Sequence, residues 1–384
     1  MHAVYVLRAY LTPRIRRRLV VVVSGIFGVL VAACAPDVEV AMPREVVTPS
    51  SSSTTTTMQA PTTTTTTAPT TTTTTVAPPL DTDDVPRVVR TTTDVVLPVL
   101  SEVENGLLVR TPCQNTAIVQ GGEVEDRVHV VIDPGHGGNE TGAVSPDEIT
   151  EKAVNLEVAL LTEARLEELG FEVTLTRYTD IRVPILTRVE IADRLEASLL
   201  ISIHHQSSDP FPISDEPGTE VFYPRFSQEG KRFAGLLVEE SRAELGKFDI
   251  DWFTPTDAGA VYRLNANTGG DFYGMIRRPE VTAVLAEMGF MGNEAELALM
   301  RTGEMQEAES IAISNAVVRF FNTDDPGSGF VEPSFELTAA GAGGGLSGCE
   351  DPDLGETFDL AGELAESFGQ GDDSDDSIES VAQG

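Results

Sequence analysis

Residues 128–138 read Val-His-Val-Val-Ile-Asp-Pro-Gly-His-Gly-Gly, an apolar run that ends in a turn around one histidine, His136. An apolar run rich in Val and Ile before a Pro-Gly turn predicts a buried strand. Open α/β folds bind their ligands beyond the carboxyl ends of such strands. An imidazole at that position is well placed to bind a metal, although a histidine between glycines is equally often only a turn residue.

Three more side chains occupy the ends of predicted elements. Glu151 begins a helical pattern, and a carboxylate there also complements the helix dipole without any metal. His204 and Glu287 each follow an apolar run that is typical of a buried strand. Because the carboxyl ends of core strands lie at one edge of a sheet, His136 and His204 are expected at the same edge. A glutamate after so apolar a run is costly to bury without a partner.

Two histidines and one carboxylate are the ligand set of a catalytic zinc site, in which one coordination position stays open. The remaining carboxylate can then act as general base toward a zinc-bound water. Spacing alone does not decide which carboxylate is the ligand. Asp133, Glu140 and Glu148 are candidates as well as Glu151.

Six short motifs follow one another between residues 133 and 293. They are Asp133-Pro-Gly-His-Gly-Gly138, Glu151-Lys-Ala-Val-Asn-Leu156, Leu175-Thr-Arg-Tyr-Thr-Asp180, Leu186-Thr-Arg-Val-Glu-Ile-Ala192, Ser202-Ile-His204 and Ala286-Glu-Met-Gly-Phe-Met-Gly-Asn293. In this order they resemble the zinc-dependent N-acetylmuramoyl-L-alanine amidases of the amidase 3 family. The resemblance implies that His136, Glu151 and His204 bind Zn²⁺ and that Glu287 is the catalytic glutamate.

The chain departs from this family directly after His204. The family has a small residue and Asn there, whereas this chain has His205 and Gln206, a difference that concerns substrate contacts more than the metal. His205 is an alternative ligand, but adjacent strand residues point to opposite faces, which favours His204. His129 lies in mid-strand and is expected to be a packed core residue.

The resemblance implies a peptidoglycan hydrolase that cleaves the amide between N-acetylmuramic acid and L-alanine with a zinc-activated water. Glu287 would take the water proton and return it to the leaving amine. One alternative is a non-catalytic cell-wall-binding module with the same fold, which would lack a ligand or the glutamate. Another is a zinc peptidase that acts on stem peptides, which product analysis would separate.

The pattern of elements predicts one α/β catalytic domain over residues 111–323 with a mainly parallel twisted sheet and helices on both faces. The predicted strands are residues 128–133, 172–177, 198–203, 219–223 and 281–286. The predicted helices are residues 151–169, 184–197, 228–245 and 305–321. Three aromatic side chains are expected to pack rather than to bind substrate: Trp252, Tyr262 and Tyr273.

Residues 1–34 have the layout of a signal peptide, with arginines before an apolar run. Its last residues, Val31-Ala-Ala-Cys34, resemble a lipoprotein box, which implies lipid attachment to Cys34. We therefore expect export to the cell envelope and anchoring to the outer face of the cytoplasmic membrane. An ordinary signal peptide and an uncleaved anchor are the alternatives.

The flanks of the domain differ from it in composition. Residues 35–110 are rich in Thr, Pro and Ser and predict a disordered linker, because few apolar side chains offset the ordering entropy. Residues 324–384 predict a flexible tail, rich in glycine first and acidic afterwards. The fold class is therefore a single catalytic domain flanked by disordered segments.

The formal net charge of -35 argues against nucleic acid as a partner, since nucleic acid requires a basic surface. It also argues against electrostatic docking on anionic lipids. The expected partners are peptidoglycan and, through the N-terminal lipid or signal anchor, the membrane. An activator protein is compatible with these features, but the sequence identifies none.

The chain has three cysteines. If lipid is attached to Cys34, Cys113 and Cys349 remain as an even pair in an oxidising compartment. One precedes the domain and the other follows it, and domain termini often lie close together. We therefore predict a Cys113–Cys349 disulfide.

Overall fold

The computed structural model describes residues 76–207, 218–250, 259–337 and 344–358. The signal peptide, the lipoprotein box and linker residues 35–75 lie outside the described residues, as does Trp252. None of the helices in the described part is both long and apolar enough to cross a membrane.

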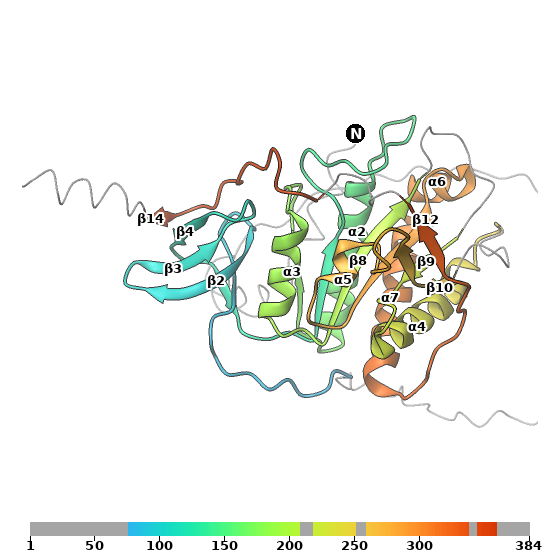
Figure 1. Ribbon diagram of the computed structural model, residues 1–384, viewed down its shortest axis with the longest axis horizontal. Helices are drawn as coiled ribbons and strands as arrows, with labels where there is room; N and C mark the ends of the chain where they lie inside the picture. Colours follow the sequence, from blue (N-terminus) through green and yellow to red (C-terminus); the bar gives the residue numbers. More distant parts are fainter. Residues whose placement is uncertain (1–75, 208–217, 251–258, 338–343, 359–384) are drawn as a thin grey trace, which may run out of the picture. The chain divides into compact units, whose positions relative to one another are not determined.

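The central sheet is mainly parallel, as predicted (Figure 1). Its strand order is β10 (Gly259–Val261), β9 (Glu220–Phe222), β12 (Ala283–Phe290), β8 (Leu199–Gln206), β6 (Val130–Pro134) and β7 (Val173–Leu175). Only the pair β9–β12 is antiparallel. The central strands β6, β8 and β12 are almost continuously buried because helices cover both of their faces.

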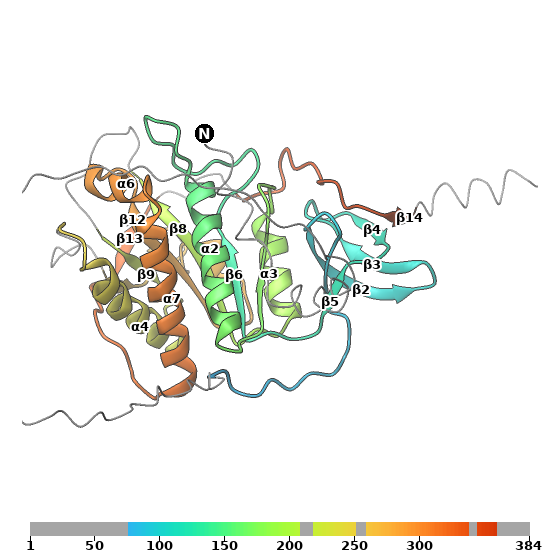
Figure 2. The same ribbon diagram turned by 180° about the vertical axis from the view of Figure 1, so that it is seen from behind.

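Two groups of helices cover the central sheet (Figures 1 and 2). One face is covered by α2 (Glu151–Glu168), α4 (Gln228–Leu245) and α7 (Glu304–Asn322). The other face carries α3 (Ile185–Arg194) and the short α5 (Gly274–Arg277). A further short helix, α6 (Glu294–Met300), packs against α7. The four predicted helices are present, with ends that shift by a few residues at most.

A second, antiparallel sheet corrects the predicted flanks. Its order is β14 (Thr357–Phe358), β4 (Thr116–Val119), β3 (Gly106–Arg110), β2 (Val96–Val103), β1 (Val88–Arg90) and β5 (Glu123–Glu125). The prediction of a disordered linker over residues 35–110 was therefore wrong for residues 88–110, which contain β1, β2 and β3. Apolar side chains from these strands form a core of their own, which includes Val89, Leu97, Val99, Val109 and Val119.

The second sheet also packs against the central one. Val88 and Val96 belong to the main core, and the Arg90 guanidinium lies 3.7 Å from the ring centroid of Tyr178. Both sheets belong to one compact unit. The strands before residue 111 therefore extend the predicted domain rather than link it to another part.

The prediction of a flexible tail over residues 324–384 was wrong for the residues that form β13 (Ser334–Glu336) and β14. Within residues 324–337, β13 pairs in parallel with β11 (Arg263–Asn265), and β14 completes the second sheet. The predicted Cys113–Cys349 disulfide is present, with 5.6 Å between the two Cα atoms. Strand pairing and the disulfide thus hold a segment whose composition alone predicts disorder.

Candidate metal centre

The turn after β6 presents the first histidine. His136 has a φ of +61°, in the left-handed region that non-glycine residues seldom adopt. Arg188 donates to the carbonyls of Pro134 at 2.7 Å and His136 at 2.6 Å. Arg177 donates to those of Pro134 and Gly135, both at 3.0 Å. The two buried guanidinium groups therefore satisfy the turn's carbonyls and hold His136 in place.

Glu151, the first residue of α2, is buried beside this turn. Its Oε1 accepts hydrogen bonds from the backbone N–H of His205 at 3.2 Å and from Asn155 Nδ2 at 3.4 Å. Its Oε2 accepts from the backbone N–H of Ala143 at 2.9 Å. The carboxylate is thus fixed from three directions before any cation is considered.

His136, Glu151 and His204 converge on one point. Glu151 Oε1 lies 3.1 Å from His136 Nε2 and 2.9 Å from His204 Nδ1. One possible ligand atom from each residue lies within 4.8 Å of the other two. Two imidazole nitrogens and a carboxylate oxygen at this spacing fit the donor set of a catalytic zinc ion.

Two glycines leave room for these side chains. A Cβ atom on Gly135 would overlap the His204 ring. Gly142 has a φ of +64°, and a Cβ there would overlap the Glu151 carboxylate and contact the His136 ring. Both positions therefore require glycine for steric reasons, and Gly142 for its backbone conformation as well.

The environment holds Glu151 ionised. Burial opposes the charge, but hydrogen bonds with His136 and His204 outweigh it and hold the pKa of Glu151 well below its usual range. Burial lowers the pKa of His204, although Glu151 partly offsets that effect. A cation requires deprotonated ligands, that is, a neutral imidazole and an ionised carboxylate.

Glu287 lies on β12 directly beside His204 on β8. Its Oε2 atom is buried and has no hydrogen-bond partner among the described residues. Burial and the negative charges of Glu151 and Glu220 raise the pKa of Glu287 well above its usual range, and Arg263 partly offsets them. A buried carboxylate oxygen without a partner is costly, so its position favours a functional role over a structural one.

The other carboxylates that spacing left open lie outside the cluster. Asp133 accepts from Arg188 and from Ser202 and Thr176, so its oxygens are already occupied. Glu148 is exposed. Glu140 pairs with Arg182 at 2.9 Å.

The remaining histidines point away from the cluster. His205 is buried on the opposite side of β8, where Nδ1 lies 2.7 Å from Asn155 Oδ1 and Nε2 lies 3.2 Å from the Glu309 carboxylate. His129 is a buried core residue, with Nε2 at 2.9 Å from the carbonyl of Pro78. The strand alternation that favoured His204 over His205 agrees with this arrangement.

Two aromatic residues behave as expected from packing. Tyr273 lies 4.8 Å from Phe222, measured between ring centroids, and Tyr262 lies 6.0 Å from Tyr223. Tyr273 also accepts a hydrogen bond from Arg263 at 2.6 Å. Their rings are therefore occupied by contacts within the protein.

Sequence reasoning did not find the roles of Arg177, Arg188 and Asn155. All three lie within the quoted motifs, but each donates to a backbone carbonyl of residues 134–136, and Arg188 and Asn155 also bind side chains around the cluster. Burial and the charge of Arg188 lower the pKa of Arg177 to about 9. Burying a charged arginine costs free energy, so its burial indicates a structural role. The position of Arg177 in its motif does not reveal that this role is to bind the turn carbonyls.

The chain is similar in sequence to proteins of one family. The family model described as N-acetylmuramoyl-L-alanine amidase matches residues 130–319. The N-acetylmuramoyl-L-alanine amidase AmiA of Escherichia coli K12 is 30% identical over 228 residues, which cover 51% of this chain and 77% of AmiA. The amidase AmiC of Neisseria meningitidis is 26% identical over 245 residues, or 55% of this chain and 57% of AmiC.

Among solved structures, the amidase AmiC2 of Nostoc punctiforme is 30% identical, with a TM-score of 0.41. The match covers 51% of this chain and 98% of AmiC2. The chain spans only 57% of the Neisseria relative's length.

Proposed function

Because this chain belongs to the N-acetylmuramoyl-L-alanine amidase family, we propose that it hydrolyses the amide between N-acetylmuramic acid and L-alanine in peptidoglycan. The observation that carries this proposal is the convergence of His136, Glu151 and His204 beside the unpartnered carboxylate oxygen of Glu287. The expected substrate is the cell wall, and the proposed catalytic domain is the predicted 111–323 region extended by the strands from Val88 onward and by β13 and β14.

His136, Glu151 and His204 are the proposed ligands of a Zn²⁺ ion. The fit rests on the donor set and on the way neighbouring groups fix Glu151 in advance. Zn²⁺ held there would lower the pKa of a water molecule and polarise the amide carbonyl. His205 is excluded from this role by its contacts with Asn155 and Glu309.

Glu287 is the proposed proton carrier. Its free oxygen accepts the proton of the attacking water and returns it to the nitrogen of the leaving amine when the C–N bond breaks. No side chain competes for that oxygen among the described residues. Its register opposite His204 on the neighbouring strand supports this role.

The non-catalytic wall-binding alternative is disfavoured because all four functional groups are assembled. A zinc peptidase that cleaves stem peptides would use the same groups on a different amide. We further propose that the chain is exported and anchored through lipid on Cys34, where it would meet peptidoglycan outside the membrane.

The test uses the full chain with purified peptidoglycan, before and after treatment with a chelator. The expected result is release of stem peptides with a free amino-terminal alanine, loss of this release in chelator, and recovery after Zn²⁺ is added. Release that persists in chelator would contradict a metal-dependent reaction. Glu287→Gln serves as the control, because it should keep the metal and lose turnover.

A further inference from the structure

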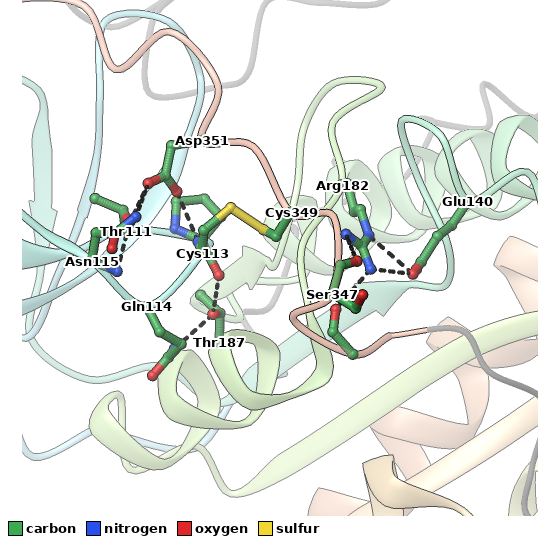
Figure 3. Close-up of a disulfide and its surroundings, with 12 residues drawn as sticks. Thr111, Cys113, Gln114, Asn115, Glu140, Arg182, Thr187, Ser347, Cys349 and Asp351 are labelled. Atoms are coloured by element: carbon green, nitrogen blue, oxygen red, sulfur yellow. Dashed lines mark hydrogen bonds and ion pairs between the residues drawn. A yellow bond between two sulfur atoms is a disulfide. The ribbon is translucent and has the colours of Figure 1, made fainter.

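A segment beyond the family match crosses beside the loop that leads into Glu151 (Figure 3). We call residues 344–351 the strap and residues 137–150 the site loop. The site loop contains no helix and only the isolated bridges Gly137–Glu140 and Val144–Thr150. Its position therefore depends on contacts with its surroundings.

Arg182 and Ile185 hold the first half of the strap. Arg182 donates from Nη1 to the carbonyl of Ser347 at 3.1 Å and from Nη2 to that of Gly345 at 2.7 Å. The backbone N–H of Ile185 donates to the carbonyl of Gly344 at 2.9 Å. The strap thus follows the segment between β7 and α3.

Glu140 joins the strap to the site loop. Its Oε1 accepts from Arg182 Nε at 3.0 Å and from the backbone N–H of Gly344 at 2.8 Å. The side chains of Arg182 and Glu140 are only 11% and 16% exposed, so water screens this ion pair less than it would at the surface. One carboxylate therefore ties three segments together.

The same loop contacts the proposed metal ligand three residues later. The backbone N–H of Ala143 donates to Glu151 Oε2 at 2.9 Å, and the N–H of Glu151 donates to the carbonyl of Ala143 at 2.8 Å. Lys152 N–H donates to the carbonyl of Thr141 at 3.1 Å. A displacement of the loop would move the donor that orients the Glu151 carboxylate.

The second half of the strap is fixed to the start of the domain. The Cys113–Cys349 disulfide joins it covalently, and Asp351 accepts from the backbone N–H of Cys113 at 2.8 Å. Asp351 also accepts from Thr111 Oγ1 at 2.8 Å and from Asn115 Nδ2 at 2.9 Å. The disulfide therefore limits how far the strap can leave Arg182 and Glu140.

We propose that the strap positions the site loop, and through it Glu151, for metal binding. Glu140 and Arg182 are positioning residues, and the Cys113–Cys349 bridge keeps the strap beside them. The inference rests on the proposed metal site at His136, Glu151 and His204. Outer groups that orient a metal ligand typically change metal affinity by about 10–100-fold.

The experiment compares the full chain with two variants, Cys113→Ser/Cys349→Ser and Glu140→Ala. Zn²⁺ affinity is measured by competition with a chromophoric chelator, and hydrogen exchange is followed over residues 137–151. Both variants should bind Zn²⁺ roughly tenfold or more weakly. Exchange should rise in the site loop and stay unchanged in α4.

Glu140→Gln is the matched control, because its amide oxygen can still accept from Arg182 and Gly344. It should recover most of the affinity that Glu140→Ala loses. Unchanged affinity and unchanged exchange in both test variants would overturn the inference. If the wild-type chain bound no Zn²⁺, the proposed function would fail, and exchange in the site loop would still decide whether the strap positions it.

Discussion

At the scale of residues, two glutamates of the site have opposite environments. Hydrogen bonds with His136 and His204 hold the pKa of Glu151 low, whereas burial and nearby negative charge raise that of Glu287. The first carboxylate is suited to hold a cation, and the second is suited to exchange a proton.

Removal of any proposed ligand should deplete the metal. Alanine at His136, Glu151 or His204 should leave about a tenth or less of the zinc that the wild-type chain retains after dialysis, because two ligands seldom hold Zn²⁺ tightly. Elemental analysis of the purified variants measures this. Zinc that stays near one ion per chain in all three variants would contradict the ligand assignment.

Substitution of Glu287 should separate catalysis from metal binding. Glu287→Gln keeps the shape of the side chain but cannot accept the proton, so kcat should fall by about 10²–10⁴-fold while zinc content stays unchanged. Turnover of peptidoglycan fragments and elemental analysis on the same sample provide both values. Full turnover in this variant would remove Glu287 from the mechanism.

Each of the four proposed site residues lies next to a strong local pattern, an apolar strand or the start of a helix, but only the family resemblance selected Glu151 as the ligand among the carboxylates. The supporting residues could not be predicted. Arg188 binds carbonyls of residues 134 and 136, and His205 reaches Glu309 on α7, contacts that depend on tertiary packing. Spacing alone left Glu140 as a ligand candidate, and the sequence did not show that it pairs with Arg182.

At the scale of elements, α2 begins at the site with Glu151 and also carries a second buried carboxyl group, Glu163. Glu163 on α2 accepts a hydrogen bond from the Tyr178 hydroxyl at 2.6 Å. Burial raises the pKa of Glu163 to about 8, although this hydrogen bond partly offsets it. The unfolded chain releases the Glu163 proton near pH 4.5 and the folded state near pH 8, so Glu163 lowers stability as pH rises between these values.

Glu163→Gln should remove this dependence. The amide still accepts from Tyr178 but does not titrate, so from pH 5 to pH 8 the variant should lose less stability than wild type, by an amount on the order of a few kcal/mol. Urea unfolding at both pH values measures it. Glu296 has a similarly raised pKa, about 8, and is present in both proteins, so their difference isolates Glu163. Equal losses would show that Glu163 ionises normally.

The second sheet shows why the flanks were predicted wrongly. β14 at residues 357–358 pairs with β4 at residues 116–119, so its partner is distant in the sequence. β1 has only three residues and follows Thr-rich and Pro-rich sequence, which hides its alternation. Five strands of the central sheet were predicted with ends within four residues of those observed, whereas the three-residue β10 was not predicted.

At the scale of the whole molecule, the strongly acidic chain should not adhere to anionic membranes by charge, so anchoring would depend on Cys34. Cys34→Ala should move most of the protein from the membrane fraction to the soluble exported fraction. Fractionation with a blot against the catalytic domain measures this. Retention of the variant in the membrane fraction would favour an uncleaved anchor over a lipid.

The central claim is that this chain cleaves the bond between N-acetylmuramic acid and L-alanine. Mass spectrometry of peptidoglycan digested by the full chain tests it most directly. We predict glycan strands with an intact lactyl group and complete stem peptides that begin with L-alanine. Products cut within the stem peptide, with the muramic acid still bound to L-alanine, would contradict the account.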